Sequence, residues 1–227
     1  MRRRLAENAL FFREYVRNFH STGALLPSGR FLAAALARYV GPNATAGQKP
    51  AAGGQPQRIL EVGPGTGAVT RHIISRMGKT DTLDLVELNE TFVRQLRERF
   101  EREPAFQAVA DRARVLHCPV EELPQEQTYD VIVSGLPLNN FSAELVEQIL
   151  ARLVGLLSPG GTLSFFEYIA VRPARALVSG RAERARLRGV AAAMRAVLDP
   201  HEIGRDAVLL NVPPAWVHHV RRELAAK

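Results

Sequence analysis

A glycine-rich segment, residues 61–68 (EVGPGTGA), has the residue types of a ligand site lined by backbone. Glycines let the backbone approach a ligand closely, and the helix expected after the turn offers unpaired N–H groups. Glu61 stands directly before the turn, where its carboxylate can pair with a cationic amino group. Glu87, about 20 residues further on, supplies a second carboxylate that can accept both hydroxyls of a ribose. The pattern predicts a site for a cofactor that contains a nucleoside.

Two classes of cofactor fit this pattern. Gly63, Gly65 and Ala68 satisfy the G-x-G-x-x-G/A motif of dinucleotide-binding turns, whereas S-adenosylmethionine carries the amino group that Glu61 could hold. The commonest small nicotinamide enzymes need a Tyr-x-x-x-Lys pair, but none of the three lysines of this chain follows a tyrosine at that spacing. The sequence therefore favours S-adenosylmethionine. A glycine-rich turn that binds no cofactor is the remaining alternative.

Short apolar strands that alternate with helices must position these residues. We expect strands at 59–62, 83–87, 114–117, 129–133 and 162–166, a helix at 144–157, and a closing hairpin of 207–212 and 216–221. Such alternation predicts a mostly parallel sheet with helices on both faces, because the crossover helices must cover it. The fold class is therefore a doubly wound α/β domain.

The chain divides into three parts by composition. Residues 1–40 predict a helical extension, residues 41–57 (GPNATAGQKPAAGGQPQ) a flexible linker, and residues 58–227 the α/β domain. The apolar positions of residues 5–19 fall on one face of a helix, and Ser28 is expected to cap a second helix that reaches Tyr39. The first helix could lie in a membrane interface, pack onto the sheet or close over the cofactor.

Composition and charge exclude several classes of protein. The 227 residues include one cysteine, Cys118, which rules out an intramolecular disulfide framework, and they contain no apolar run long enough to span a membrane. The net charge of +7 is concentrated in residues 1–38 (+5) and 172–195 (+6). These basic segments predict docking to an anionic surface, either lipid or nucleic acid, or else they are solvated helix faces.

The motifs taken together resemble class I S-adenosylmethionine-dependent methyltransferases. The resemblance rests on EVGPGTG at 61–67, the acid at 87, GLPL at 135–138 and LSPGGTL at 157–163. It implies a Rossmann-like class I methyltransferase fold with a seven-stranded sheet, S-adenosylmethionine as cofactor, S-adenosylhomocysteine as product, and no metal. The implied cofactor-binding residues are Glu61, Gly63, Pro64, Gly65, Thr66, Gly67, Glu87, Leu88, Val120, Glu121 and Ser134.

One position departs from this family pattern. Pro119 stands where these enzymes often place an aspartate after the third strand to bind the adenine amino group. Glu121 or a backbone carbonyl is left to make that contact. Cys118 is expected near the adenine, and we interpret His117, His201, His218 and His219 as structural.

Three further stretches, 22–32, 134–141 and 210–215, resemble bacterial phospholipid N-methyltransferases. The resemblance implies stepwise methylation of phosphatidylethanolamine toward phosphatidylcholine. It implies a cytoplasmic protein, peripherally associated with an anionic phospholipid surface at the inner face of the cell membrane, with no nucleic-acid partner. The alternatives are an rRNA adenine N6-dimethyltransferase or another RNA or protein amine methyltransferase. The rRNA family has Asn-Leu-Pro-Tyr or Asn-Leu-Pro-Phe where this chain has GLPL at 135–138.

The same resemblance implies roles around the substrate amine. The Leu136 carbonyl, made rigid by Pro137, would orient the amine, with Asn139 as a polar helper unless it caps the following helix. Substrate binding is assigned to three residues of the N-terminal segment. Arg30 is the candidate for the lipid phosphate, because a guanidinium binds phosphate oxygens in a bidentate fork, and the other two are Tyr15 and Ser28.

Overall fold

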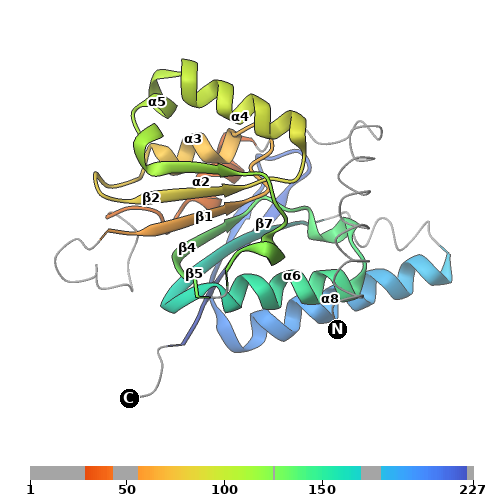
Figure 1. Ribbon diagram of the computed structural model, residues 1–227. Helices are drawn as coiled ribbons and strands as arrows, with labels where there is room; N and C mark the ends of the chain where they lie inside the picture. The colour runs from red at the N-terminus through yellow and green to blue at the C-terminus, as the bar shows by residue number, and fades with distance from the viewer. Residues whose placement is uncertain (1–28, 43–55, 125, 170–179, 224–227) are drawn as a thin grey trace.

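A seven-stranded sheet forms the centre of the computed structural model, which describes residues 29–42, 56–124, 126–169 and 180–223 (Figure 1). The strand order is β3-β2-β1-β4-β5-β7-β6, and all neighbouring strands are parallel except where β7 pairs with β5 and β6. The bounds are β1 (Arg58–Val62), β2 (Thr82–Val86), β3 (Ala113–Leu116), β4 (Tyr129–Ser134), β5 (Leu157–Tyr168), β6 (Glu202–Val208) and β7 (Ala215–Arg221). The predicted Rossmann-like, mostly parallel sheet is confirmed.

Helices cover both faces of this sheet (Figure 1). One face carries α2 (Arg30–Leu36), α3 (Ala68–Ile74), α4 (Glu90–Arg102) and α5 (Pro104–Gln107), and the other carries α6 (Ala143–Gly155) and α8 (Arg181–His201). Single 3₁₀ turns occur at η2 (Ala110–Arg112), η3 (Val120–Glu122) and η4 (Leu138–Asn140). None of the helices within these described ranges has the length and apolar composition needed to cross a bilayer.

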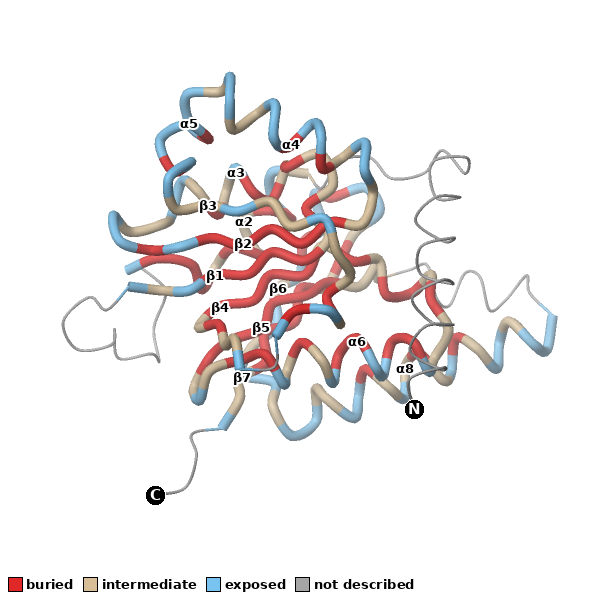
Figure 2. Tube along the Cα trace, viewed as in Figure 1, coloured by how far each residue is buried: buried red, intermediate tan, exposed pale blue. Residues whose placement is uncertain are grey.

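The core follows from strand alternation, which sends successive side chains to opposite faces. Leu60 and Ile132 pack with α6 and α8, whereas Ile59 and Val131 pack with α2, α3 and α4. Figure 2 shows the resulting buried band along the central strands. Leu32 and Leu36 of α2 are fully buried in the second cluster, so residues 30–40 pack onto the sheet as part of its core.

Two predicted boundaries are wrong. The N-cap of α2 is Gly29 instead of Ser28, and no side chain caps the helix. The Gly29 N–H donates to the side chain of Asn211 at 3.1 Å. The helix ends at Leu36 and stops short of Tyr39. The last hairpin begins five residues earlier than expected, at Glu202, and residues 209–214 form its turn. The polar residues of β6 are tolerated because this strand lies at the edge of the sheet.

The carboxyl ends of β1, β2 and β4 meet at one edge of the sheet, where open α/β folds bind their ligands. The turn between β6 and β7 lies at the same edge. Ser134, the last residue of β4, pairs with Phe165, and Tyr168 at the end of β5 pairs with Ala215 at the start of β7. The fold therefore gathers the predicted cofactor loop, the 135–138 loop and the hairpin turn at one edge.

Candidate active site

The loop between β1 and α3 is shaped by three glycines in the left-handed region. Gly63, Gly65 and Gly67 have φ values of 70°, 55° and 81°, which residues with a side chain rarely adopt. A Cβ on Gly65 would meet no atom within 4 Å, so this face of the loop is open. The Gly67 N–H closes the turn by donating to the carbonyl of Pro64 at 2.9 Å. The loop can therefore bring its backbone close to a ligand.

Glu61 is a buried carboxylate that lacks a partner. Only 1% of the residue is exposed, and neither carboxylate oxygen has a hydrogen-bond partner among the described residues. Burial raises the pKa of Glu61 to about 8; the hydroxyl and backbone N–H of nearby Thr70 lower it in part, although neither makes a hydrogen bond of normal geometry to the carboxylate, and Glu87 raises it further. Burying such a group without compensation is costly, so the site has the chemistry of a pocket for a cation.

Asp84 on the neighbouring strand shows what a satisfied buried carboxylate looks like in this protein. Its two oxygens accept from Arg114 at 2.7 Å each, and one of them also accepts from the Tyr129 hydroxyl at 2.9 Å. Asp84 therefore needs nothing beyond the chain. Glu61 lacks any comparable partner, which points to a ligand.

Glu87 is buried directly after β2 and ties the glycine loop to the loop between β2 and α4. One carboxylate oxygen accepts from the Gly65 N–H at 3.0 Å, and the other accepts from the N–H groups of Leu88 and Asn89 at 2.8 Å each. Burial raises the pKa of Glu87, and these backbone N–H groups partly lower it again. Asn89 in turn caps α4. The predicted residues Gly65, Glu87 and Leu88 are thus brought into one cluster.

The loop after β4 packs directly against the glycine loop. The Gly135 N–H donates to the Val62 carbonyl at 2.9 Å, and a Cβ on Gly63 would lie 2.7 Å from a methyl carbon of Leu136. Ser134 is fully buried, and its hydroxyl oxygen accepts from the Leu136 N–H at 3.4 Å. Ser134 therefore positions the loop. Any contact of its side chain with the cofactor stays a prediction.

Pro137 makes this loop turn sharply. Its φ of −79° and ψ of 75°, with the Leu138 N–H donating to the Leu136 carbonyl at 2.9 Å, form an inverse γ-turn. A carbonyl oxygen has two acceptor sites, so the Leu136 carbonyl can still accept from a ligand. The turn therefore fixes the position of the Leu136 carbonyl, which is predicted to orient the substrate amine.

Asn139 is 3% exposed, and neither polar atom of its side chain has a hydrogen-bond partner in the part of the chain described here. It does not cap the following helix. Ser142 does so, because its hydroxyl accepts from the Leu145 N–H at 3.3 Å. The backbone carbonyls of Asn139 and Phe141 both accept from Arg186 of α8, which reaches across from a distant segment.

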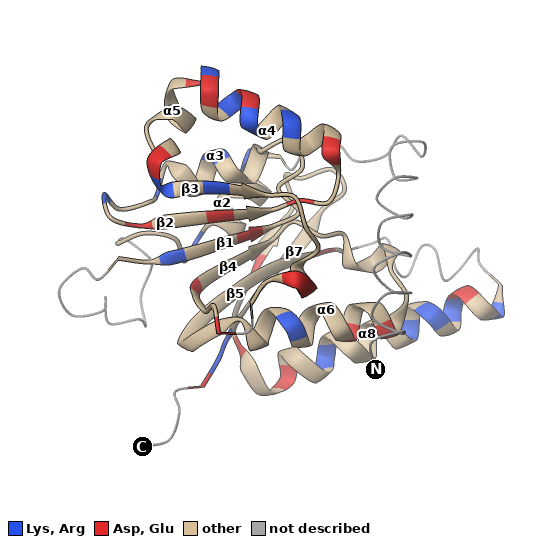
Figure 3. Ribbon diagram, in the orientation of Figure 1, with Lys and Arg blue, Asp and Glu red and all other residues tan. Residues whose placement is uncertain are grey.

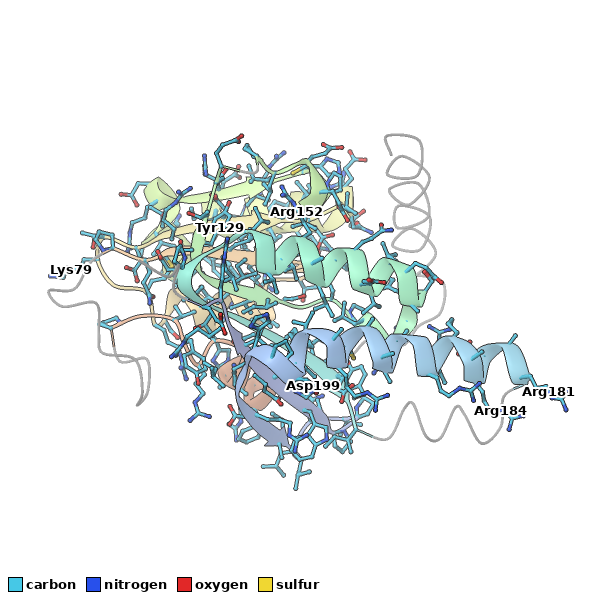
Figure 4. The ribbon with its side chains drawn as sticks, turned by 90° about the horizontal axis from the view of Figure 1, so that it is seen from below. Lys79, Tyr129, Arg152, Arg181, Arg184 and Asp199 are labelled. Carbon is cyan, nitrogen blue, oxygen red and sulfur yellow. The ribbon has the colours of Figure 1, made fainter. Side chains whose placement is uncertain are left out.

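The loop after β3 holds two further predicted cofactor residues. Val120 is buried in the core, and Glu121 is half-buried, with its pKa raised mainly by burial. Arg152 of α6, labelled in Figure 4, holds this loop by donating to the carbonyls of Val120 and Leu123. A contact of Glu121 or of a backbone carbonyl with the adenine, in place of the missing aspartate, stays a prediction.

The predicted substrate residues are only partly placed. Tyr15 and Ser28 lie outside the described residues, while Arg30 is exposed with its guanidinium 4.7 Å above the ring of Phe31. In Figure 3 the basic residues colour several stretches of the α8 ribbon blue, and in Figure 4 the side chains of Arg181 and Arg184 extend from its outer end. Arg186 differs from these two because it binds the 139–141 loop, a role that its sequence neighbourhood does not signal.

The two histidines of β7 have partners within the described part of the chain. His218 contacts Glu202 at 2.7 Å, and His219 contacts Asp206 at 3.1 Å and Ser164 at 2.8 Å. Within the described ranges, no three His, Cys, Asp or Glu side chains converge in a group that could hold a metal. The site residues themselves fit S-adenosylmethionine, since Glu61 needs a cation and Glu87 can accept from ribose hydroxyls beside an open glycine loop.

Comparisons with known proteins agree with this geometry. Residues 59–161 match the family model of a methyltransferase domain. The chain is 33% identical over 106 residues to the ornithine lipid N-methyltransferase of Singulisphaera acidiphila, covering 47% of this chain and 55% of that protein. It is 34% identical over 96 residues to ribosomal RNA small subunit methyltransferase A of Synechococcus sp. strain CC9605, covering 42% and 33%. The matches therefore span about half or less of this chain, and 55% and 33% of the two relatives.

Solved structures share the fold. The crystal structure of an O-methyltransferase from Bacillus cereus in complex with SAH superposes with a TM-score of 0.54 and 14% identity, covering 73% of this chain and 74% of that chain. At this level of identity the likeness concerns the fold alone. The class of domain thus follows from the family match and the fold together.

Proposed function

We propose that this chain, whose residues 59–161 form a class I S-adenosylmethionine-dependent methyltransferase domain, methylates the primary amine of phosphatidylethanolamine, stepwise toward phosphatidylcholine. The enzyme would work at the anionic inner face of the cell membrane. The observation that carries the proposal is the loop after β4. It offers one fixed carbonyl, Leu136, and its Leu138 side chain is buried in the core, so neither an aromatic ring nor an asparagine stands where the rRNA family holds its base.

The residues of the site would bind the cofactor and orient the substrate amine in this reaction. Bound S-adenosylmethionine would supply a methyl group already activated by its sulfonium, so that an N–C bond forms as the C–S bond electrons return to sulfur. Glu61 would hold the cationic amino group and Glu87 the ribose hydroxyls. The Leu136 carbonyl would accept an N–H of the substrate amine. That amine has an ordinary pKa of about 10 and must lose a proton to solvent before it attacks.

Two further facts bear on the substrate. One curated relative is named for N-methylation of an ornithine lipid, which also supports a lipid amine as substrate. The match to a ribosomal RNA methyltransferase of similar identity and the basic residues of α8 favour RNA as the second candidate. The test must therefore offer both substrates.

The deciding experiment is methyl transfer from labelled S-adenosylmethionine to anionic vesicles that contain phosphatidylethanolamine, run beside ribosomal RNA. We expect label in the extracted mono-, di- or trimethylated lipid and none in RNA. Vesicles in which phosphatidylcholine replaces phosphatidylethanolamine are the control, because they lack a primary amine. Label in RNA, with none in lipid, would transfer the assignment to the second candidate.

Arg186 tests whether the 139–141 loop must be held in place. We expect Arg186→Met to lower kcat for lipid methylation about tenfold, because a released loop no longer fixes the Leu136–Asn139 turn in a reactive position. Affinity for S-adenosylmethionine, measured by calorimetry, should stay within about twofold, since no cofactor residue is touched. Arg184→Met is the matched control, as it removes the same charge from an exposed position of the same helix. Equal kcat in the two variants would reject this positioning role.

A further inference from the structure

The turn between β6 and β7 displays large apolar side chains to solvent. Leu209, Leu210 and Val212 are 68%, 74% and 73% exposed. Turns of soluble proteins usually carry polar residues at such positions, whereas residues 207–217 (AVLLNVPPAWV) contain no charged residue. Exposed apolar clusters of this kind mark a contact surface.

The turn is held in this shape by its own polar residue. The side chain of Asn211 donates to the Pro213 carbonyl at 2.8 Å and accepts from the Gly29 N–H at 3.1 Å, and the residue is 6% exposed. Buried Asn211 thus anchors the turn to the start of α2. The apolar side chains on either side of it are left facing outward on a fixed projection.

The two segments that adjoin the turn, the start of α2 and the hairpin strands, each carry an arginine stacked on an aromatic ring. The guanidinium of Arg30 lies 4.7 Å above the ring of exposed Phe31 at the start of α2. The guanidinium of Arg205 lies 4.4 Å above the ring of Trp216, the second residue of β7. Exposed apolar side chains bordered by arginines and amphipathic aromatic rings are typical of segments that enter the interface of an anionic bilayer.

The turn also lies at the carboxyl edge of the sheet, where the cofactor loop and the Leu136 turn are found. We propose that residues 209–212 insert into an anionic bilayer and hold the active site against the lipid headgroups. This inference rests on the proposed lipid substrate. A bilayer is favoured over a protein partner because a stable protein interface buries about 800 Å² per partner. Three exposed apolar side chains on one turn provide less area than that.

The single tryptophan of the chain gives a test that needs no substitution. Trp216 is the second residue after the turn, so its fluorescence reports on the environment of this hairpin alone. With vesicles of phosphatidylglycerol and brominated phosphatidylcholine, we expect quenching, and with unbrominated vesicles a blue shift. Vesicles of neutral phosphatidylcholine alone should have a smaller effect. Protein that co-sediments with brominated anionic vesicles without any quenching would overturn the proposal.

Substitutions in the turn give the second test. Leu209→Ser combined with Leu210→Ser should weaken binding to anionic vesicles about tenfold, since two apolar side chains no longer leave water. The matched control is Ile203→Ser, which changes a residue 40% exposed in the same hairpin, at the end of β6 that lies away from the turn. Unchanged affinity for S-adenosylmethionine would verify that both variants are folded. Equal vesicle binding by the two variants would contradict the proposal.

Vesicle binding and methyl transfer are separate readouts. If the turn variant alone loses vesicle binding while wild-type protein methylates no lipid, then docking holds and the substrate assignment fails. If wild-type protein methylates lipid but the turn variant binds vesicles normally, then the substrate assignment holds and docking fails. A turn variant that instead loses a dimer in sedimentation would assign the turn to contact between copies of the chain.

Discussion

Replacing Glu61 with glutamine is expected to abolish measurable binding of S-adenosylmethionine while making the cofactor-free protein more stable. The carboxylate is buried without a partner, so its ionised form destabilises the empty fold. With a pKa of about 8 in the folded state and 4.5 as its ordinary value, the cost at pH 7 is about 3 kcal/mol. Glutamine has the same shape without the charge and removes most of that cost. Calorimetric titration and thermal unfolding measure the two effects.

The pH dependence distinguishes this explanation from a general loss of fold. Because the folded pKa of Glu61 is raised, its contribution to stability is full below about pH 4.5 and is lost as the pH rises toward 8. The burial-raised pKa of Glu87 acts in the same direction. We expect the stability of wild-type protein to fall across this window more steeply than that of Glu61→Gln.

Cofactor binding should follow the opposite trend, since a cation pairs with the ionised carboxylate. Affinity for S-adenosylmethionine should rise with pH up to about 8, and binding at pH 7 should release a proton from Glu61. Calorimetry in two buffers of different ionisation enthalpy measures that proton. Glu90→Gln, at an exposed carboxylate on α4, is the control and should change neither property. Wild-type-like cofactor affinity in Glu61→Gln would remove Glu61 from the site.

The cofactor half of the site could be predicted because it is local in sequence. A strand, a glycine turn and a helix lie within residues 58–74, and Glu87 follows at the end of the next strand. Once strands alternate with helices in a parallel sheet, these carboxyl ends must meet at one edge. The positions of Glu61, Gly65 and Glu87 therefore follow from pattern and topology. The missing partner of Glu61 does not, because burial and pairing depend on the whole packed structure.

The contacts that hold the substrate-binding side of the site join residues far apart in the sequence, so the residue pattern did not predict them. Arg186 binds carbonyls 45 and 47 positions away, and Asn211 binds Gly29 across 182 positions. The hairpin error has a related cause: the apolar residues Leu209, Leu210 and Val212 are typical of a strand and were predicted as part of one, but they lie in the turn and are exposed. Apolar residues indicate contact with something apolar, and sequence alone does not say whether this is the core.

Gly135→Ala is expected to damage both the fold and the cofactor site. A Cβ at this position would lie 2.6 Å from the carbonyl oxygen of Gly63 and 3.7 Å from that of Val62. The first distance is a steric overlap and the second an ordinary contact; because the overlapping atom belongs to the backbone, it cannot rotate away as a side chain could. The ends of β1 and β4 must separate, which we expect to cost about 1–3 kcal/mol of unfolding free energy. Urea unfolding measures that loss, and calorimetry should show cofactor affinity lowered by about 100-fold.

Two other glycines separate steric overlap from the mere addition of a methyl group. Gly155→Ala places its Cβ where no atom lies within 4 Å, at the end of α6, so stability should be equal or up to about 1 kcal/mol higher. Gly63→Ala meets a flexible methyl of Leu136 at 2.7 Å but has a φ of 70°, so its loss should arise from backbone strain as well. If Gly135→Ala were as stable as Gly155→Ala, the close packing of the two loops would not be what holds the site together. If it lost stability but kept its cofactor affinity, the loop after β4 would be structural, and the amine site would have to be sought elsewhere along the carboxyl edge.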